Sequence, residues 1–184
     1  MTQRILGIDP GTRHMGMVVV EGPTLLSYGV HTLRNGGRPH DVIGQAKRIV
    51  LGYVAKHAPQ LVAIEKPLPI ATRRGAILNV IADELRERAK ELNLEVRELG
   101  PSEIRERVAR NPKATKIEVA EKLVTLGFEV LRPMIPTKPK RSALGLRPKD
   151  KYWLHMFDAL ATAQAATGFP SEVSTVRDGH HASV

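Results

Sequence analysis

Two hydrophobic patterns alternate along this chain, one typical of β-strands and the other of helices. Short apolar runs bounded by glycine, proline or charged residues predict strands, whereas apolar residues three and four positions apart predict helices. The predicted strands are residues 5–8, 15–20, 24–33, 61–64 and 94–99. The predicted helices are residues 41–57, 72–93, 101–110, 115–126 and 151–167. The expected order is therefore three strands, a helix, a strand, a helix, a strand and three final helices.

The connections between the strands predict their directions. The first three strands are joined by short turns at Pro10-Gly11 and Gly22-Pro23, which are too short for parallel crossovers. The later strands each follow a helix, and the uniformly apolar run 61–64 is typical of a buried parallel strand. We therefore expect an α/β fold, with a mixed five-stranded sheet of three antiparallel strands and then two parallel strands, flanked by helices.

Acidic residues end two of the apolar strands. Asp9 follows the first strand and Glu65 follows the fourth, and a proline-containing turn comes after each of them. Considered alone, Asp9 would simply cap the Pro10-Gly11 turn. However, a buried carboxylate is costly unless it is paired or binds metal, and acids at the carboxyl ends of adjacent strands converge in one crevice. The pair therefore favours a shared site.

The last predicted helix carries two further candidate ligands. His155 and Asp158 lie three positions apart and therefore share a helix face. Several alanines surround them, and such small residues let a helix pack close to a sheet. We expect this face to meet Asp9 and Glu65, although a helix histidine such as His155 can also simply face solvent.

The composition limits the class of protein and its partners. The 184 residues are 42% hydrophobic, which fits one domain over residues 1–170 followed by a disordered tail over residues 171–184. No apolar run approaches the length of a membrane span. Cysteine is absent, which excludes a cysteine-zinc site and fits a cytoplasmic protein. The net charge of +9 predicts a polyanionic partner, either nucleic acid or an anionic membrane surface.

Much of the positive charge falls in one segment. Residues 132–150 are rich in proline, lysine and arginine, and Asp150 is their only acid. Such a segment is either a solvated linker or an exposed loop that contacts phosphates, and we favour the loop. Arg73 and Arg74 begin a predicted helix, where a phosphate would be favourable. The residues expected to contact DNA phosphates are Arg73, Arg74, Lys138, Lys140, Arg141, Arg147 and Lys149.

Four motifs occur in a specific order along the chain. They are LGIDPGTRHMG at 6–16, VAIEKP at 62–67, TKIEV at 115–119 and HMFDALATA at 155–163. In order and spacing they resemble the RuvC family of Holliday-junction resolvases, within the RNase H-like nuclease superfamily. The resemblance extends over residues 4–167. It implies a structure-selective endonuclease that resolves four-way junctions in DNA recombination and repair, leaving 5′-phosphate and 3′-hydroxyl nicks.

The resemblance also implies a site, cofactors and partners. It assigns catalytic and metal-binding roles to Asp9, Glu65, His155 and Asp158. It makes Lys116 a basic catalytic residue and Arg105 a second one, both also in contact with DNA. Oxygen ligands with one imidazole suit Mg²⁺ or Mn²⁺, and we expect two ions. The expected partners are four-way junction DNA, a second copy in a homodimer and a branch-migration helicase, with the dimer face on the apolar side of helix 72–93.

Two departures and three alternatives accompany this interpretation. Leu68 replaces an aromatic residue that is usual in the family, and the basic loop is longer than expected, as in a divergent, phage-encoded member. One alternative is an RNase H-like nuclease acting on RNA–DNA hybrids or other branched DNA. Another is a non-catalytic nucleic-acid-binding domain of the same fold. A third is an ATP-binding module of the actin, hexokinase and Hsp70 type, whose first phosphate loop also carries the pattern of Asp9-Pro10-Gly11-Thr12.

Overall fold

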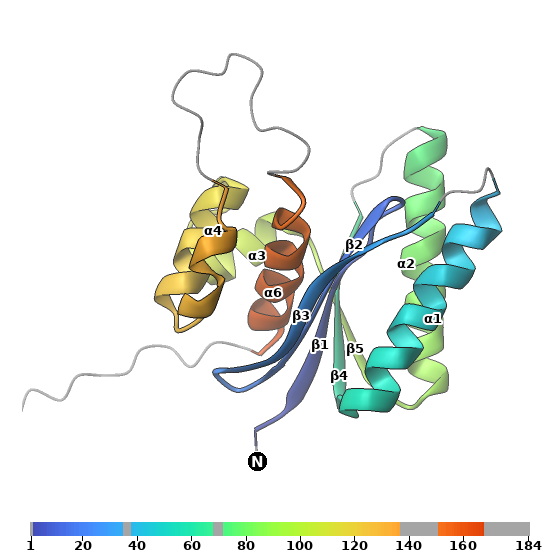
Figure 1. Cartoon of the computed structure of the whole chain (residues 1–184), viewed down its shortest axis with the longest axis horizontal. Helices are drawn as coiled ribbons and strands as arrows, with labels where there is room; N and C mark the ends of the chain where they lie inside the picture. Colours follow the sequence, from blue (N-terminus) through green and yellow to red (C-terminus); the bar gives the residue numbers. More distant parts are fainter. Residues whose placement is uncertain (1, 35–37, 68–71, 137–150, 168–184) are drawn as a thin grey trace, which may run out of the picture.

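A computed structural model describes residues 2–34, 38–67, 72–136 and 151–167 (Figure 1). In it five strands form one mixed sheet in the order β3-β2-β1-β4-β5. The strands are β1 (Arg4–Asp9), β2 (His14–Glu21), β3 (Thr24–Thr32), β4 (Leu61–Glu65) and β5 (Glu95–Leu99). Strands β1, β2 and β3 pair in antiparallel fashion, whereas β4 runs parallel to both β1 and β5. The predicted fold class is confirmed.

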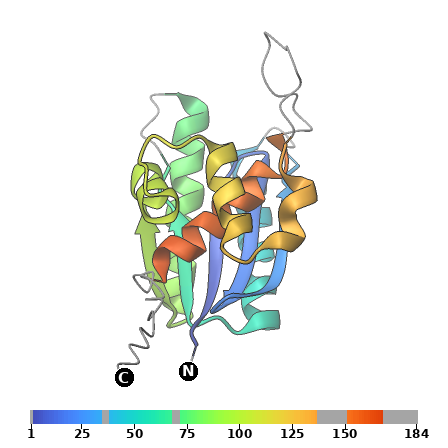
Figure 2. The same ribbon diagram turned by 90° about the vertical axis from the view of Figure 1, so that its left-hand side faces the viewer.

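Helices cover both faces of this sheet. One face is covered by α1 (Pro39–His57) and α2 (Arg73–Glu91). The other is covered by α6 (Leu154–Ala166), with α3 (Pro101–Ala109) and α4 (Lys116–Thr125) packed outside it (Figures 1 and 2). Within the described part of the chain, none of the helices has the length and apolarity of a membrane span.

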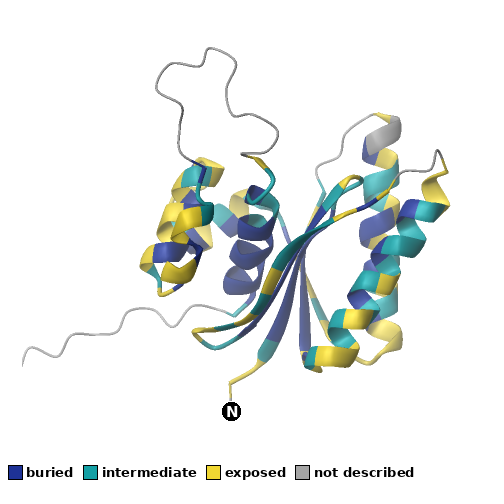
Figure 3. Ribbon diagram, in the orientation of Figure 1, coloured by how far each residue is buried: buried dark blue, intermediate teal, exposed yellow. Residues whose placement is uncertain are grey.

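The two covered faces explain why β4 is apolar throughout. Leu61 and Ala63 point into the core beneath α6, whereas Val62 and Ile64 point into the core beneath α1 and α2. All four side chains are buried (Figure 3). Successive strand residues face opposite sides, so a strand between two helical layers needs apolar residues at every position. Glu65 follows at the strand end, where the apolar run stops.

Helix α6 approaches the sheet unusually closely. A Cβ atom added at Gly7 in β1 would collide with the carbonyl oxygen of Ala159, and one added at Gly16 in β2 would collide with that of His155. These two glycines therefore let the α6 backbone rest directly on β1 and β2. The alanines of α6 are buried, as expected for a helix that packs close to a sheet.

Two arginines hold the far end of α6. Arg107 of α3 donates a hydrogen bond to the carbonyl oxygen of Ala165 at 2.9 Å, and Arg97 of β5 donates one to that of Ala166. The last carbonyls of a helix lack partners within the helix and carry partial negative charge, so guanidinium groups stabilise them. The helix is thereby fixed to the β5 side of the domain.

The structure corrects several expected boundaries. The final helix begins at Leu154 rather than at residue 151, and a turn precedes it. A 3₁₀-helix, η1 (Glu129–Met134), occupies the start of the segment expected to be an exposed loop, and Pro136 is buried. Residues 137–150 of that segment and the expected disordered tail over residues 171–184 lie outside the described residues.

The apolar side of α2 is only partly available as the expected dimer face. Ile81, Leu85 and Ala89 are buried in the core between this helix, α1 and the sheet. This part of the stripe that the sequence pattern offered to a second copy therefore stabilises the domain itself, whereas Val80 and Leu92 of the same stripe stay exposed. On the outer side of α2, Val80 is 44% exposed and Ala76 is exposed.

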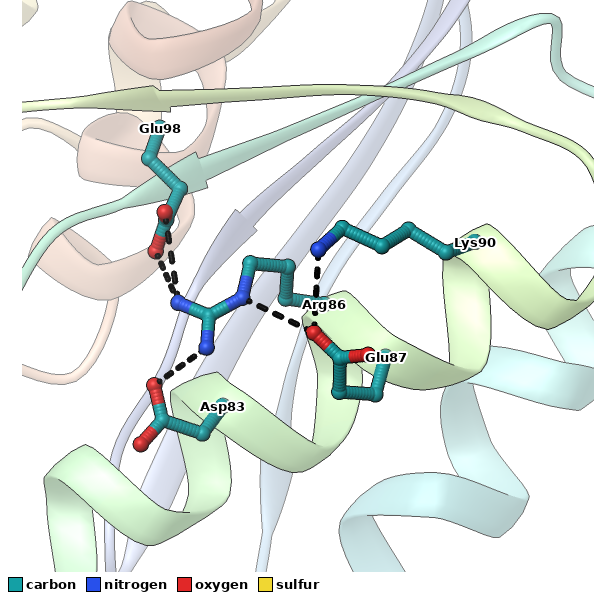
Figure 4. Close-up of polar contacts among 5 residues, drawn as sticks. All are labelled: Asp83, Arg86, Glu87, Lys90 and Glu98. Carbon is teal, nitrogen blue, oxygen red and sulfur yellow. Dashed lines mark hydrogen bonds and ion pairs between the residues drawn. The ribbon is translucent and has the colours of Figure 1, made fainter.

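An arginine joins α2 to the edge strand β5 (Figure 4). The Arg86 guanidinium lies 2.9 Å from Asp83 and 3.3 Å from both Glu87 and Glu98. Glu87 also accepts from Lys90 at 3.0 Å. Glu98 belongs to β5 and the other residues to α2, so Arg86 links two elements, whereas Lys90 contacts its own helix.

We expect Arg86→Ala to lower the free energy of unfolding by about 1 kcal/mol, because three carboxylates lose their shared cation. Lys90→Ala, the matched control on the same helix, should cost about 0.3 kcal/mol. Urea denaturation of both variants measures the difference. Equal losses would show that the link to β5 contributes nothing.

Candidate metal centre

The site begins at the carboxyl end of β1. Asp9 is the last residue of that strand and is only 8% exposed. A tight turn follows, in which a Cβ atom at Gly11 would collide with the carbonyl oxygen of His14. The turn returns the chain at once into β2. It leaves the Asp9 carboxylate at the carboxyl end of the central strand, facing α6.

The first turns of α6 bring two more ligands to Asp9. The His155 Nδ1 atom lies 2.6 Å from Asp9 Oδ2, and Asp158 follows one helical turn later. One ligand atom from each of Asp9, His155 and Asp158 lies within 4.8 Å of the others. Two carboxylates and an imidazole at this spacing fit a divalent cation that prefers oxygen ligands. The described residues therefore contain a group that could hold such a metal.

Glu65 lies beside this group but outside it. The parallel pairing of Ile8 with Ile64 puts Glu65 level with Asp9, at the carboxyl ends of the two neighbouring strands. Glu65 and Asp158 both line a small cavity. The other residues that line this cavity are Pro101, Ile104, Arg105, Lys116, Val119 and Ala161. The structure thus brings all four predicted acidic and imidazole residues to one place, but its closest cluster holds three of them.

Burial and like charges perturb both carboxylic acids of the cavity. Burial, with the negative charges of Asp9 and Asp158, raises the pKa of Glu65 to about 8. Burial and the charge of Asp9 raise the pKa of Asp158 to about 6, although Lys116 opposes this. Neutral forms are favoured because burial removes the water that would stabilise a charge, and because each added negative charge is repelled by those already present. The cluster therefore attracts positive charge.

Lys116 supplies one positive charge. It is the first residue of α4, whose start is fixed by the capping box of Thr115 and Glu118 that its sequence pattern predicts. Its ammonium donates a hydrogen bond to Asp158. Burial lowers the pKa of Lys116, but the charges of Asp158, Asp9 and Glu65 outweigh burial and raise it overall. The lysine is therefore held protonated at the cavity.

The other predicted DNA contacts fall into three groups. Arg105 lines the cavity beside Glu65 and Lys116. Arg73 and Arg74 form the first turn of α2, and their side chains are not described. The remaining predicted contacts, all in the basic loop, lie outside the described residues: Lys138, Lys140, Arg141, Arg147 and Lys149. Leu68 also lies outside them.

Two residues beside the site were not singled out from the sequence. The His14 ring lies 5.8 Å from that of His155 and 5.3 Å from that of Tyr152. His14 lies within the first motif and closes the turn after Asp9, whereas Tyr152 precedes the last motif by three positions. The ring types of His14 and Tyr152 were the only signal in the sequence that these residues could belong to the site. Their contact could not be predicted, because it depends on the fold.

A mixed sheet in the order β3-β2-β1-β4-β5, with helices on both faces, is the RNase H-like fold. Solved structures with this fold are similar to the chain over most of its length. T. thermophilus RuvC in complex with a Holliday junction substrate is 23% identical, with a TM-score of 0.66, over 90% of this chain and 92% of that one. A second structure of Thermus thermophilus RuvC is 25% identical, with the same score, over 89% and 93%.

A yeast mitochondrial Holliday junction resolvase, Ydc2, is more distant. It is 16% identical, with a TM-score of 0.60, over 89% of this chain and 77% of that one. No protein-family model matches the chain, and a search of curated proteins finds no match. The predicted likeness to RuvC resolvases is therefore confirmed through the three-dimensional fold.

We expect the metal-free chain to lose stability as the pH rises from about 4.5 to about 8. In that window folded Glu65 keeps its proton, whereas the unfolded chain has released it, so folding takes up a proton. Glu65→Gln removes this uptake and should raise the free energy of unfolding by about 1–3 kcal/mol at pH 8, with little effect below pH 4.5.

Urea denaturation in a chelator across this pH range measures the effect. Glu121→Gln, an exposed site on α4, is the control and should leave the pH profile unchanged. A Glu65→Gln profile parallel to that of the wild type would contradict the raised pKa.

Proposed function

We propose that this chain is a structure-selective DNA endonuclease that resolves four-way junctions by metal-dependent hydrolysis of phosphodiester bonds. The observation that carries the proposal is the cluster of Asp9, at the carboxyl end of β1, with His155 and Asp158 of α6. This cluster lies on a fold shared with a RuvC protein whose structure contains a Holliday junction. The products would be nicks with a 5′-phosphate and a 3′-hydroxyl.

Asp9, His155 and Asp158 would hold Mg²⁺ or Mn²⁺, and Glu65 would complete a second ion position. Two such ions, when bound, supply an activated water and stabilise the leaving oxygen of an in-line displacement. The Asp9 carboxylate orients the His155 ring through the 2.6 Å contact at Nδ1. Burial and the charges of Asp9 and Asp158 raise the pKa of Glu65, and positive charge arriving beside those carboxylates would cancel their repulsion and favour release of the Glu65 proton.

Lys116 and Arg105 would act on the DNA at the cavity. The protonated Lys116 ammonium would stabilise the negative charge that develops on the scissile phosphate. Arg105 would contact a neighbouring phosphate from α3. Arg73, Arg74 and the basic loop would extend this phosphate surface, in agreement with the net charge of +9.

A four-way junction has two-fold symmetry, so we infer that the chain acts as a homodimer with two active sites. The proposed contact is the exposed Val80 of the apolar stripe together with the exposed Ala76, both on the N-terminal half of α2. A cytoplasmic location and a branch-migration helicase as a further partner belong to the same proposal.

Cleavage of three substrates tests the function. With Mg²⁺ or Mn²⁺ the chain should cut a four-way junction in preference to a linear duplex or an RNA–DNA hybrid. Asp9→Asn should reduce junction cutting by about 10³-fold, because an amide is a poorer metal ligand than a carboxylate. Asp83→Asn, the same change on the outer side of α2, should leave cutting unchanged.

Two results would contradict the proposal. Cutting that survives Asp9→Asn would exclude the metal centre, and equal cutting of the linear duplex would exclude junction selectivity. Preferred cutting of the hybrid would instead identify the alternative RNase H-like activity.

A further inference from the structure

The start of α6 is attached to β2 and β3. The carbonyl oxygen of His155 lies so close to Gly16 of β2 that no side chain fits between them. Tyr152, in the turn before the helix, donates a hydrogen bond from its hydroxyl to the carbonyl oxygen of Val30 in β3 at 2.7 Å. Gly16 and Val30 are directly paired across the two strands. Both contacts therefore hold the helix start at one position along the sheet.

Ring contacts extend this attachment to the metal centre. The Tyr152 ring meets the His14 ring edge-on, with centroids 5.3 Å apart at 80°. The His14 ring lies 5.8 Å from the His155 ring, and its Nδ1 atom lies 3.3 Å from the Thr32 hydroxyl. A row of rings thus connects the strand pair to the imidazole that contacts Asp9.

We propose, on the basis of the proposed function, that Tyr152 is a positioning residue for the metal centre. One ligand, Asp9, belongs to β1, whereas His155 and Asp158 belong to α6. The distances within the cluster therefore depend on the position of α6 along its own axis relative to β1. Apolar packing of α6 through small side chains tolerates a short slide, because it is not directional. The directional Tyr152 hydrogen bond fixes the helix where the 2.6 Å contact between His155 and Asp9 can form.

Tyr152 acts through the helix rather than on the substrate. Its hydroxyl donates to a backbone carbonyl, and its half-buried ring is in contact with the rings of His14 and Trp153. Loss of the hydroxyl should therefore weaken metal binding and slow the chemical step, while DNA binding is retained. A residue that contacted DNA would instead change the KM for the junction.

Tyr152→Phe removes only this hydroxyl, and Tyr53→Phe is its matched control. The Tyr53 hydroxyl is also part-buried and lies 3.0 Å from His31 Nε2, but on the α1 side of the sheet. We expect Tyr152→Phe to weaken Mn²⁺ binding about three- to tenfold and to lower kcat by a similar factor. The KM for the junction should stay within about twofold, and Tyr53→Phe should match the wild type in all three.

Free Mn²⁺ measured by electron paramagnetic resonance gives the affinity without any cleavage. If Tyr152→Phe binds Mn²⁺ like the wild type, or if both variants weaken binding equally, the positioning role is overturned. If the wild type binds Mn²⁺ but cuts no junction, the proposed function fails, while a selective loss of affinity in Tyr152→Phe still supports the positioning role. A wild-type chain that binds no Mn²⁺ overturns both.

Discussion

The close contact between α6 and the strand pair β1–β2 determines the rest of the site. Gly7 and Gly16 leave no side chain between the helix backbone and the sheet, so α6 lies deeper than helices with larger residues at the contact. That depth brings His155 and Asp158 within reach of Asp9. The arginines at the far end of α6 and Tyr152 at its start then fix the helix along its axis. All three ligands therefore lie on regular secondary structure, one on β1 and two on α6.

The charges of the site follow from this packing. Burial beneath the helices, together with the nearby negative charges, raises the pKa of Glu65 and Asp158, and Lys116 balances part of the negative charge. The balance is incomplete, since Glu65 keeps a pKa of about 8 beside Asp9 and Asp158. A site of this kind favours a cation, and its basic neighbours Lys116 and Arg105 favour a phosphate. The fold therefore provides both a site that favours a metal cation and basic residues that favour a phosphate, as the hydrolysis of a phosphodiester requires.

The sequence patterns predicted the sheet well because they report local constraints. Apolar runs, short turns and the acids at strand ends are enough to predict five strands and to bring Asp9 and Glu65 to one edge. The patterns could not predict which acids come closest, because that depends on the depth of α6. They also missed η1 and the ring contacts of Tyr152, which depend on packing between distant segments. The apolar stripe of α2 was assigned to a dimer because periodicity does not identify the surface that covers it.

A crystal structure grown with Mn²⁺ and analysed by anomalous scattering tests the central claim most directly. The account predicts an anomalous peak about 2.2 Å from ligand atoms of Asp9, His155 and Asp158, with the Lys116 ammonium displaced from Asp158. A second peak near Glu65 would agree with a two-ion site. Full Mn²⁺ occupancy elsewhere in the molecule, with the Lys116–Asp158 contact intact, would contradict it.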